Sequence, residues 1–341
     1  MPADLELTAA APAAGGLRRS FSWRPRFGHL LALLAAVPIL ALLALFIFLV
    51  LYAKPAMPID GWHFLVRDTW NLGNLYADPV IVHGRQMLPG ASYGILFLIV
   101  GTLASAALAV VFALPLAVLS ALLLAELLKG IPAFLASTLI ELLAAVPSVV
   151  YGLWGYVFLI PFLDHHLYGF LERRVGPWLP FFAGPRGSGY GLLTSAIVLA
   201  IMVVPLITAT LRDGLAATPR ELREAGRALG ATGFESAWRV VLRGQRPVLF
   251  GATILALGRA LGETMAVLMV SGNALNYLPH NIYAPISTMA AFIVSQLDSA
   301  LQDPTGMALR ALAEIALVLL IITVAVNLAA RLLLQFYGRR K

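Results

Sequence analysis

An arginine and a glutamate lie four residues apart inside a long apolar stretch of the chain, at positions 259 and 263. Residues at this spacing share one face of a helix, so Arg259 and Glu263 are predicted to lie side by side. A guanidinium offers a planar fork of donors that fits an oxyanion such as phosphate or sulfate. The carboxylate could hold the arginine in place, or accept a proton from a protonated phosphate. The residues alone leave two interpretations, an anion contact in a transport path or an ion pair that only locks two helices together.

The composition predicts which elements carry these residues. Hydrophobic residues make up 60% of the 341-residue chain, charged residues 12%, and the mean hydropathy is +0.87. Such a chain has too little polar surface for a soluble domain and too much apolar surface for a disordered one. Apolar stretches of about 20 residues or more predict membrane-spanning helices. There are six, at about Leu30–Tyr52, Ser92–Leu124, Pro132–Phe158, Gly191–Leu211, Pro247–Val270 and Leu309–Leu334. We therefore expect an all-α integral membrane protein with six transmembrane helices.

The basic residues predict the orientation of these helices. Sixteen Lys and Arg residues fall in the two terminal segments and the two loops on the same side, against six in the opposite loops. Because basic residues favour the cytoplasmic side, both termini are predicted to be cytoplasmic. The outer loop at about 53–91 holds Trp62, Trp70 and Tyr76, which are typical of an interfacial aromatic belt or of a docking surface.

Three further polar residues lie in the apolar stretches. Pro147 interrupts the third stretch, and Ser148 beside it could either satisfy the backbone groups that proline frees or line a path. Glu141, two turns earlier, is interpreted as a hydrogen-bonded contact between helices. Glu314 in the last stretch is predicted either to snorkel toward the membrane surface or to pair with Arg310.

The basic loop from 212 to 246 contains two predicted short helices. Thr218, Pro219 and Glu221 predict an N-cap, a first helical residue and a capping-box glutamate. Leu222, Ala225 and Leu229 form an apolar stripe at helical spacing, and Gly230 and Gly233 interrupt it. A second helix is predicted at about 235–242. A short helix with one apolar side suits either a partner's groove or the lipid interface.

This loop resembles the EAA loop of ABC importer permeases. Glu224-Ala225-Gly226 takes the place of Glu-Ala-Ala, Gly230 takes the place of the following glycine, and residues 240–243 replace the family's Ile-x-Leu-Pro ending. Gly226 and Arg243 depart from the pattern. In that family the helix before the glycine docks in a cleft of the ATPase subunit. The resemblance thus implies a type I ABC importer permease fold and assigns ATPase coupling to Glu224, Ala225, Gly226, Leu229 and Gly230.

Two other segments narrow the resemblance. The run Gly-Arg-Ala-Leu-Gly-Glu-Thr-Met-Ala-Val-Leu-Met-Val-x-Gly-Asn at 258–273 resembles phosphate-specific permeases of the PstC type, as does Ala-Val-Pro-Ser-Val-Val-Tyr-Gly-Leu-Trp-Gly at 145–155. In that family the Arg and Glu of the first motif are implicated in phosphate passage, which implies this role for Arg259 and Glu263. We add Thr264 and Ser148 as candidate path residues. A sulfate or molybdate permease, the partner phosphate permease or an ATP-independent anion transporter is the alternative.

The resemblance also implies a set of partners. These are a homologous second permease of the PstA type, two copies of a PstB-type ATPase, a periplasmic or lipid-anchored phosphate-binding protein of the PstS type, and the lipid bilayer of a bacterial inner membrane. No nucleic acid is expected. The sequence has no phosphate-loop motif, so ATP and Mg²⁺ belong to the partner ATPase. With no cysteine and no credible catalytic or metal cluster, including His165 and His166, the chain is predicted to be non-catalytic and to bind no cofactor.

The predicted organisation has four parts. Residues 1–28 form a disordered cytoplasmic tail, and residues 29–89 contain the first transmembrane helix and an outer loop. Residues 90–335 form the importer transmembrane domain, with the EAA coupling loop at about 213–246. Residues 336–341 are a basic cytoplasmic end.

Overall fold

The computed structural model describes residues 25–185 and 187–338. It separates into two compact units that meet within the first helix, α1 (Pro25–Ala53), between Ile47 and Phe48. The predicted tail lies outside the described residues up to position 24, and α1 begins at Pro25, five residues before the predicted start. The four-part division of the chain stays a prediction.

The predicted apolar stretches correspond to helices of the structure. Four helical segments are long and apolar enough to cross a membrane, at Leu31–Ala53, Leu96–Leu127, Leu192–Ala216 and Met307–Leu332. Two bent pairs raise the number to as many as six, namely Ile131–Ala145 with Ser148–Arg174 and Gly233–Gly244 with Arg246–Leu261. The prediction of six spans agrees with this upper count over the described residues.

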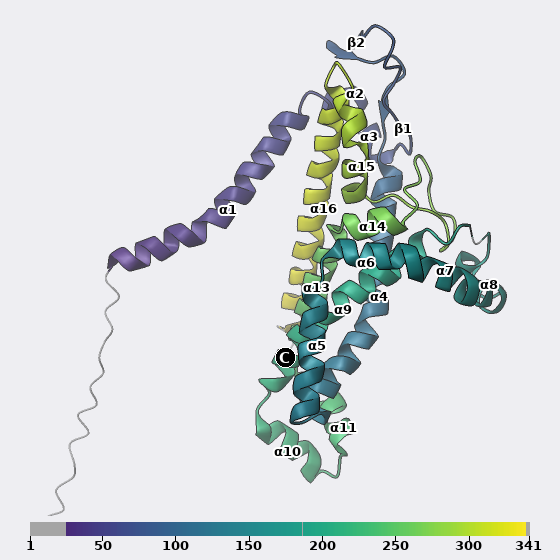
Figure 1. The fold of residues 1–341 in the computed structure, drawn as a ribbon. Coiled ribbons are helices and arrows are strands. Elements are labelled where there is room, and N and C mark those ends of the chain that lie inside the picture. Colours follow the sequence, from purple (N-terminus) through teal and green to yellow (C-terminus); the bar gives the residue numbers. More distant parts are fainter. Residues whose placement is uncertain (1–24, 186, 339–341) are drawn as a thin grey trace, which may run out of the picture. The chain divides into compact units, whose positions relative to one another are not determined.

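The centre of the second unit is a pair of helices packed through small residues. In α4 (Leu96–Leu122), Ala109, Ala113, Ala117 and Ala121 recur every four residues and are fully buried. Such a stripe lets backbones approach closely, and α9 (Leu192–Ala216) packs along α4. The Thr208 hydroxyl on α9 donates to the Ala117 carbonyl at 3.4 Å. A third helix, α13 (Arg246–Leu261), packs against both members of this pair, and α16 (Met307–Gly338) packs against α13 (Figure 1).

The third span bends sharply where its sequence contains proline. The first half is α5 (Ile131–Ala145), and α6 (Ser148–Trp154) begins after a break at 146–147. A residue before proline is pushed out of the helical region, and Val146 accordingly has a ψ of 129°. The two helices form an angle of 92°. The second half continues with two π-helical segments, Gly155–Leu159 (η2) and Leu163–Tyr168 (η3), that alternate with two α-helical ones, Ile160–Phe162 (α7) and Gly169–Arg174 (α8). His165 and His166 lie in η3.

The end of the unit that carries residues 54–95 has its own small core (Figure 1). Two antiparallel pairs of short strands, absent from the all-helical prediction, join Trp70–Asn71 (β1) with Ser92–Tyr93 (β4) and Val80–Val82 (β2) with Arg85–Met87 (β3). Trp70 is 2% exposed and packs edge-on against Phe292, so its assignment to an aromatic belt is wrong, whereas Trp62 and Tyr76 are exposed. The other helices at this end are Met57–Asp60 (α2), His63–Val66 (α3) and Met289–Leu301 (α15). The short helix Pro180–Phe182 (η4) lies elsewhere, where the Ile282 N–H donates to the Phe181 carbonyl at 3.0 Å.

The opposite end carries the predicted basic loop (Figure 1). It contains α10 (Arg220–Ala228) and a continuous helical segment built from Gly233–Ser236 (α11), Ala237–Val241 (η5) and Leu242–Gly244 (α12). A π-helical turn, η1 (Leu123–Leu127), extends α4 to the same end. Both predicted short helices are therefore present, with boundaries shifted by a few residues.

Candidate functional site

The fifth predicted span is two helices instead of one. The first, α13, ends at Leu261, and α14 (Met265–Val270) begins after a three-residue break that contains Glu263. Glycine has a low helix propensity, and the backbone groups freed at Gly262 and beyond find side-chain partners. The Thr264 hydroxyl donates to the Gly262 carbonyl at 3.3 Å. The prediction that Arg259 and Glu263 share one face of a continuous helix is therefore wrong.

Arg259 lies in the last turn of α13 with an exposed side chain. Among the residues that the structure describes, no hydrogen bond or ion pair to its guanidinium occurs, and none joins it to Glu263. Arg259 does lie close enough to the phenol of Tyr151, on α6, for an electrostatic interaction. The guanidinium donors are therefore unused within the described residues.

Glu263 is used locally, at the start of α14. Its Oε1 accepts a hydrogen bond from the backbone N–H of Ala266 at 3.3 Å. A carboxylate is favourable at a helix N-terminus because the first N–H groups have no partner within the helix. The side chain is half-buried, so one carboxylate oxygen remains for other contacts.

Ser148 and the break at 262–264 belong to elements that cross closely. A Cβ added to Gly152 on α6 would lie 2.9 Å from the Ala266 Cα and 2.9 Å from the Met269 sulfur. The crossing of α6 over α14 therefore depends on this glycine. Ser148 is one turn before Gly152, at the first position of α6, and its hydroxyl makes no hydrogen bond to the described part of the chain. This geometry does not support the interpretation that the Ser148 hydroxyl satisfies the backbone groups freed by Pro147.

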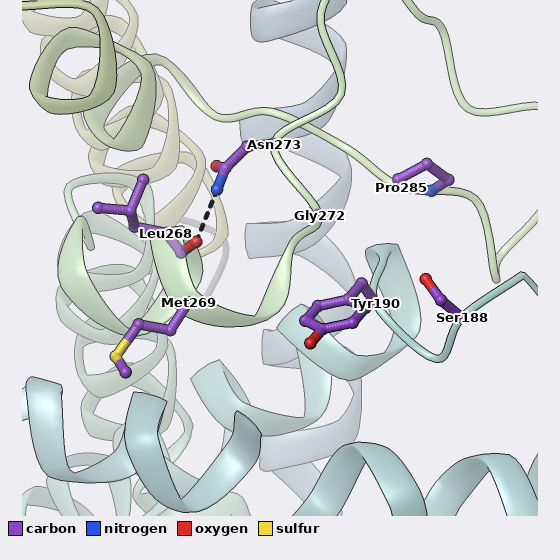
Figure 2. Close-up of a pocket in the computed structure, with 7 residues that line it drawn as sticks. All are labelled: Ser188, Tyr190, Leu268, Met269, Gly272, Asn273 and Pro285. Carbon is purple, nitrogen blue, oxygen red and sulfur yellow. Dashed lines mark hydrogen bonds between the residues drawn. The ribbon is translucent and has the colours of Figure 1, made fainter. Parts of the chain in front are cut away.

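A cavity of about 430 Å³ opens at the end of α14 away from Glu263 (Figure 2). The Asn273 side chain closes the helix end by donating from Nδ2 to the Leu268 carbonyl at 2.7 Å (Figure 2). The lining offers hydroxyl, amide and apolar groups but no charge; it consists of Ser188, Tyr190, Leu268, Met269, Gly272, Asn273 and Pro285.

The predicted coupling segment presents an apolar surface. On α10 and just after it, Leu222 is 48% exposed and Leu229 is 91% exposed, and Glu224 and Ala225 are exposed as well. Gly230 follows with a φ of +85°, a conformation that favours glycine, and ends the helix where the sequence predicts. Gly226 differs, because it faces inward and a Cβ there would lie 2.7 Å from the Ser236 Oγ.

The predicted N-cap of α10 is wrong. The cap residue is Pro219, and no side chain caps this helix. The Thr218 hydroxyl instead accepts a hydrogen bond from Gln245 Nε2 at 3.0 Å. A capping box does occur at α11, where Thr232 and Glu235 satisfy each other's backbone N–H groups. The Thr-x-x-Glu spacing at 232–235 was the signal that could have revealed it.

Three charged residues outside the fifth span, Glu141, Glu314 and Arg223, differ in their contacts. Glu141 pairs with Arg212 at 3.0 Å, which agrees with its interpretation as a contact between helices. Glu314 is buried and no ion pair joins it to Arg310, so that predicted pair is wrong. The residue that sequence reasoning missed is Arg223, whose guanidinium binds Glu126 at 2.9 Å across 97 positions of the sequence. Within the described residues no group of three or more potential metal ligands occurs.

Comparisons with known proteins assign the family. The model of the binding-protein-dependent transport system inner membrane component matches residues 113–341. The phosphate transport system permease protein PstC 1 of Mycobacterium tuberculosis is 45% identical over 299 residues, which are 87% of this chain and 88% of that protein. The PstC protein of Pasteurella multocida is 35% identical and covers 86% of this chain and 88% of its own length. A chain of the MetNI methionine ABC transporter superposes with a TM-score of 0.47 at 18% identity, over 71% of this chain and 96% of that chain.

The chain is an inner-membrane, multi-pass permease component of a binding-protein-dependent ABC transport system. Within this class it belongs to the PstC family of phosphate transport system permeases. The predicted resemblance is confirmed, and with it the assignment of a non-catalytic transport subunit. Membership in such a system implies an ATPase and a binding protein as partners.

Proposed function

We propose that this chain forms half of the translocation path of an ATP-driven importer of inorganic phosphate, with Arg259 as the residue that contacts the anion. The observation that carries the proposal is the exposed guanidinium beside the break in the fifth span, which has no hydrogen bond or ion pair to the part of the chain that the structure describes. A cation near the centre of a bilayer costs about 2.5–3.5 kcal/mol on insertion scales. A helix that keeps one without an internal counter-charge needs a counter-charge from outside the chain, and the curated relatives are phosphate permeases.

Glu263 and its neighbours take supporting roles in this proposal. The Glu263 carboxylate oxygen left free beside Ala266 accepts a proton from an incoming protonated phosphate. Thr264 and Ser148 are half-buried, carry hydroxyl groups, and come from the two elements that cross at Gly152. Hydroxyl groups suit an oxyanion because they donate hydrogen bonds without holding it permanently.

The exposed position of Arg259 also requires a second permease. We propose a homologous PstA-type subunit that completes the path from the other side. Two copies of a PstB-type ATPase bind the apolar surface of α10 and use the ATP and Mg²⁺, while this chain binds neither. A periplasmic or lipid-anchored PstS-type protein delivers phosphate at the opposite end. The assembly lies in a bacterial inner membrane with both termini of this chain in the cytoplasm.

Uptake of radiolabelled phosphate tests the proposal. Cells without their own phosphate importers would express this chain with its ATPase, partner permease and binding protein, with sulfate in excess as the competitor. We expect uptake that resists sulfate and falls at least about 100-fold in Arg259→Gln, because the loss of a charge-assisted bidentate contact and of the attraction that brings the anion there act together.

The matched control is Arg331→Gln, which removes an exposed arginine from the end of α16. It is expected to transport at the wild-type rate, with membrane levels of all variants checked by immunoblot. Sulfate-sensitive uptake would assign a different oxyanion. Wild-type uptake in Arg259→Gln would remove Arg259 from the path.

A further inference from the structure

We propose that Arg223 is the positioning residue through which the coupling helix α10 moves the transmembrane helices α4 and α9. The proposal rests on the function proposed above and adds a residue that the EAA motif does not include. Within α10, two residues differ from the others in their exposure. Of the nine residues of α10, most side chains are exposed, whereas Gly226 is buried and Arg223 is half-buried.

The Arg223 guanidinium binds a carboxylate at the end of α4. Its Nε donates to the two oxygens of Glu126 at 3.0 and 3.1 Å, and its Nη2 lies 2.9 Å from Oε1. The side chains are 18% and 9% exposed, so water competes little for these bonds. A bidentate arrangement fixes direction as well as distance. Glu126 belongs to the π-helical turn that extends α4, so any displacement of Arg223 acts on that helix.

The same guanidinium binds the end of α9. Nη1 donates to the Thr218 carbonyl at 2.5 Å, and Nη2 donates to the Leu215 carbonyl at 2.6 Å. Thr218 lies two residues beyond α9, and the Leu215 carbonyl also accepts from the Thr218 N–H at 3.1 Å. Carbonyls at the C-terminus of a helix carry partial negative charge, which a cation stabilises. Arginine can serve three acceptor groups at once because it has five N–H donors in a fixed plane, whereas lysine is a flexible point charge.

The two helices that Arg223 joins pack closely against each other. The alanine stripe of α4 packs along α9, and both contact α13, the helix that carries Arg259. Among the described residues, no other side chain of α10 makes a hydrogen bond or an ion pair to α4 or α9. The Ser236 hydroxyl donates to the Arg223 carbonyl at 3.3 Å, which ties α10 to α11 instead. A force applied by the ATPase at Leu222 and Leu229 therefore reaches the helix pair through the Arg223 side chain.

The test measures coupling in the complete transporter. This chain, the partner permease, the ATPase and the binding protein would be reconstituted in proteoliposomes, with phosphate uptake and ATP hydrolysis recorded together. We expect Arg223→Gln to assemble and to hydrolyse ATP at the wild-type basal rate, but to transport at least about 10-fold less phosphate per ATP, which corresponds to about 1.4 kcal/mol. Arg223→Lys is expected to lose several-fold, because one ammonium cannot serve Glu126 and both carbonyls.

Arg220→Gln is the matched control. Arg220 is the first residue of the same helix. It is exposed and makes no hydrogen bond or ion pair to the described side chains, so its removal changes the same charge without touching the link. It is expected to keep the wild-type amount of phosphate per ATP. Glu126→Gln provides a second way to weaken the link, and should lower the ratio in a manner that is not additive with Arg223→Gln.

Three results would overturn the proposal. The first is wild-type phosphate per ATP in Arg223→Gln. The second is a parallel fall of uptake, ATP hydrolysis and assembled complex, which would make Arg223 merely structural. The third is an equal effect of Arg220→Gln. Absence of phosphate uptake in the wild-type assembly, with another oxyanion transported, would instead contradict the proposed substrate and leave the coupling ratio measurable with that anion.

Discussion

Two arginines of this chain have opposite surroundings. Arg259, in the broken fifth span, is exposed and has no hydrogen bond or ion pair within the described residues. Arg223, in the cytoplasmic loop, donates to a carboxylate and to two backbone carbonyls. A guanidinium whose donors are all occupied fixes the positions of its partners, whereas one with free donors can bind an arriving anion. This difference supports the two roles proposed above, a positioning role for Arg223 and an anion contact for Arg259.

The largest effect is expected where the two crossing elements near Arg259 approach most closely. A valine at Gly152 would place side-chain atoms where only 2.9 Å separates a Cβ from the Ala266 Cα. Overpacking of this kind costs about 1–3 kcal/mol, and backbone cannot move aside as a flexible side chain can. We expect Gly152→Val to abolish uptake and to lower the amount of assembled complex.

Gly251→Ala serves as the control for that change. Gly251 is exposed on α13, and a Cβ there meets no atom within 4 Å. Uptake and assembly should remain at the wild-type level. Normal uptake in Gly152→Val would show that α6 and α14 do not cross in this way in the membrane.

Double-mutant cycles compare the two arginines directly. Because no ion pair joins Arg259 to Glu263, the effects of Arg259→Gln and Glu263→Gln on the stability of the assembled complex should combine within about 0.3–0.5 kcal/mol of additivity. The effects of Arg223→Gln and Glu126→Gln should depart from additivity by more, since those side chains touch. Strong coupling between Arg259 and Glu263 would instead support the ion pair that their spacing in the sequence predicts.

The smallest effect concerns the capping box of the cytoplasmic loop. The backbone N–H and hydroxyl of Thr232 donate to the Glu235 carboxylate and lower its pKa below the ordinary value of 4.5. Because the pKa is lowered in the folded state, the Glu235 carboxylate stabilises the folded state fully above pH 4.5. This stabilisation is lost as the pH falls through the folded-state pKa. Hydrogen exchange of residues 232–236 should therefore be slower at pH 7 in the wild type than in Glu235→Ala, after correction for intrinsic rates. Equal protection in both would contradict the capping box.

The sequence predicts the spans better than the breaks within them. Long apolar runs identify the membrane helices because a bilayer demands them, and Pro147 marks the bend of the third span because proline restricts the residue before it. The break at Gly262–Thr264 was missed, since the i,i+4 spacing of Arg259 and Glu263 assumes an unbroken helix. Its cause is local competition, in which the Glu263 carboxylate and the Thr264 hydroxyl bind backbone groups that a helix would otherwise use.

Long-range polar contacts were the least predictable feature. Thr218 has the residue type of an N-cap, but Gln245, 27 positions later, binds its hydroxyl. Arg223 was counted only as a basic residue of the loop, because nothing in its own segment indicates Glu126 at the end of α4. Trp70 likewise is of a residue type common at membrane interfaces, and only the fold brings it against Phe292. Contacts between residues far apart in the sequence cannot be predicted from the residues next to each of them.

The absence of cysteine in this chain allows the role of Arg259 to be measured most directly. Arg259→Cys would be assembled with its partner subunits and treated with a methanethiosulfonate reagent that adds an ethylammonium group, or with a neutral reagent of similar size. The complex with unmodified Arg259 controls for cysteines in the partners. If the guanidinium meets the anion, uptake is lost in Arg259→Cys, returns in part with the ammonium group and not with the neutral one, and phosphate slows the labelling. Wild-type uptake in Arg259→Cys, or equal recovery with both reagents, would contradict an anion contact at this residue.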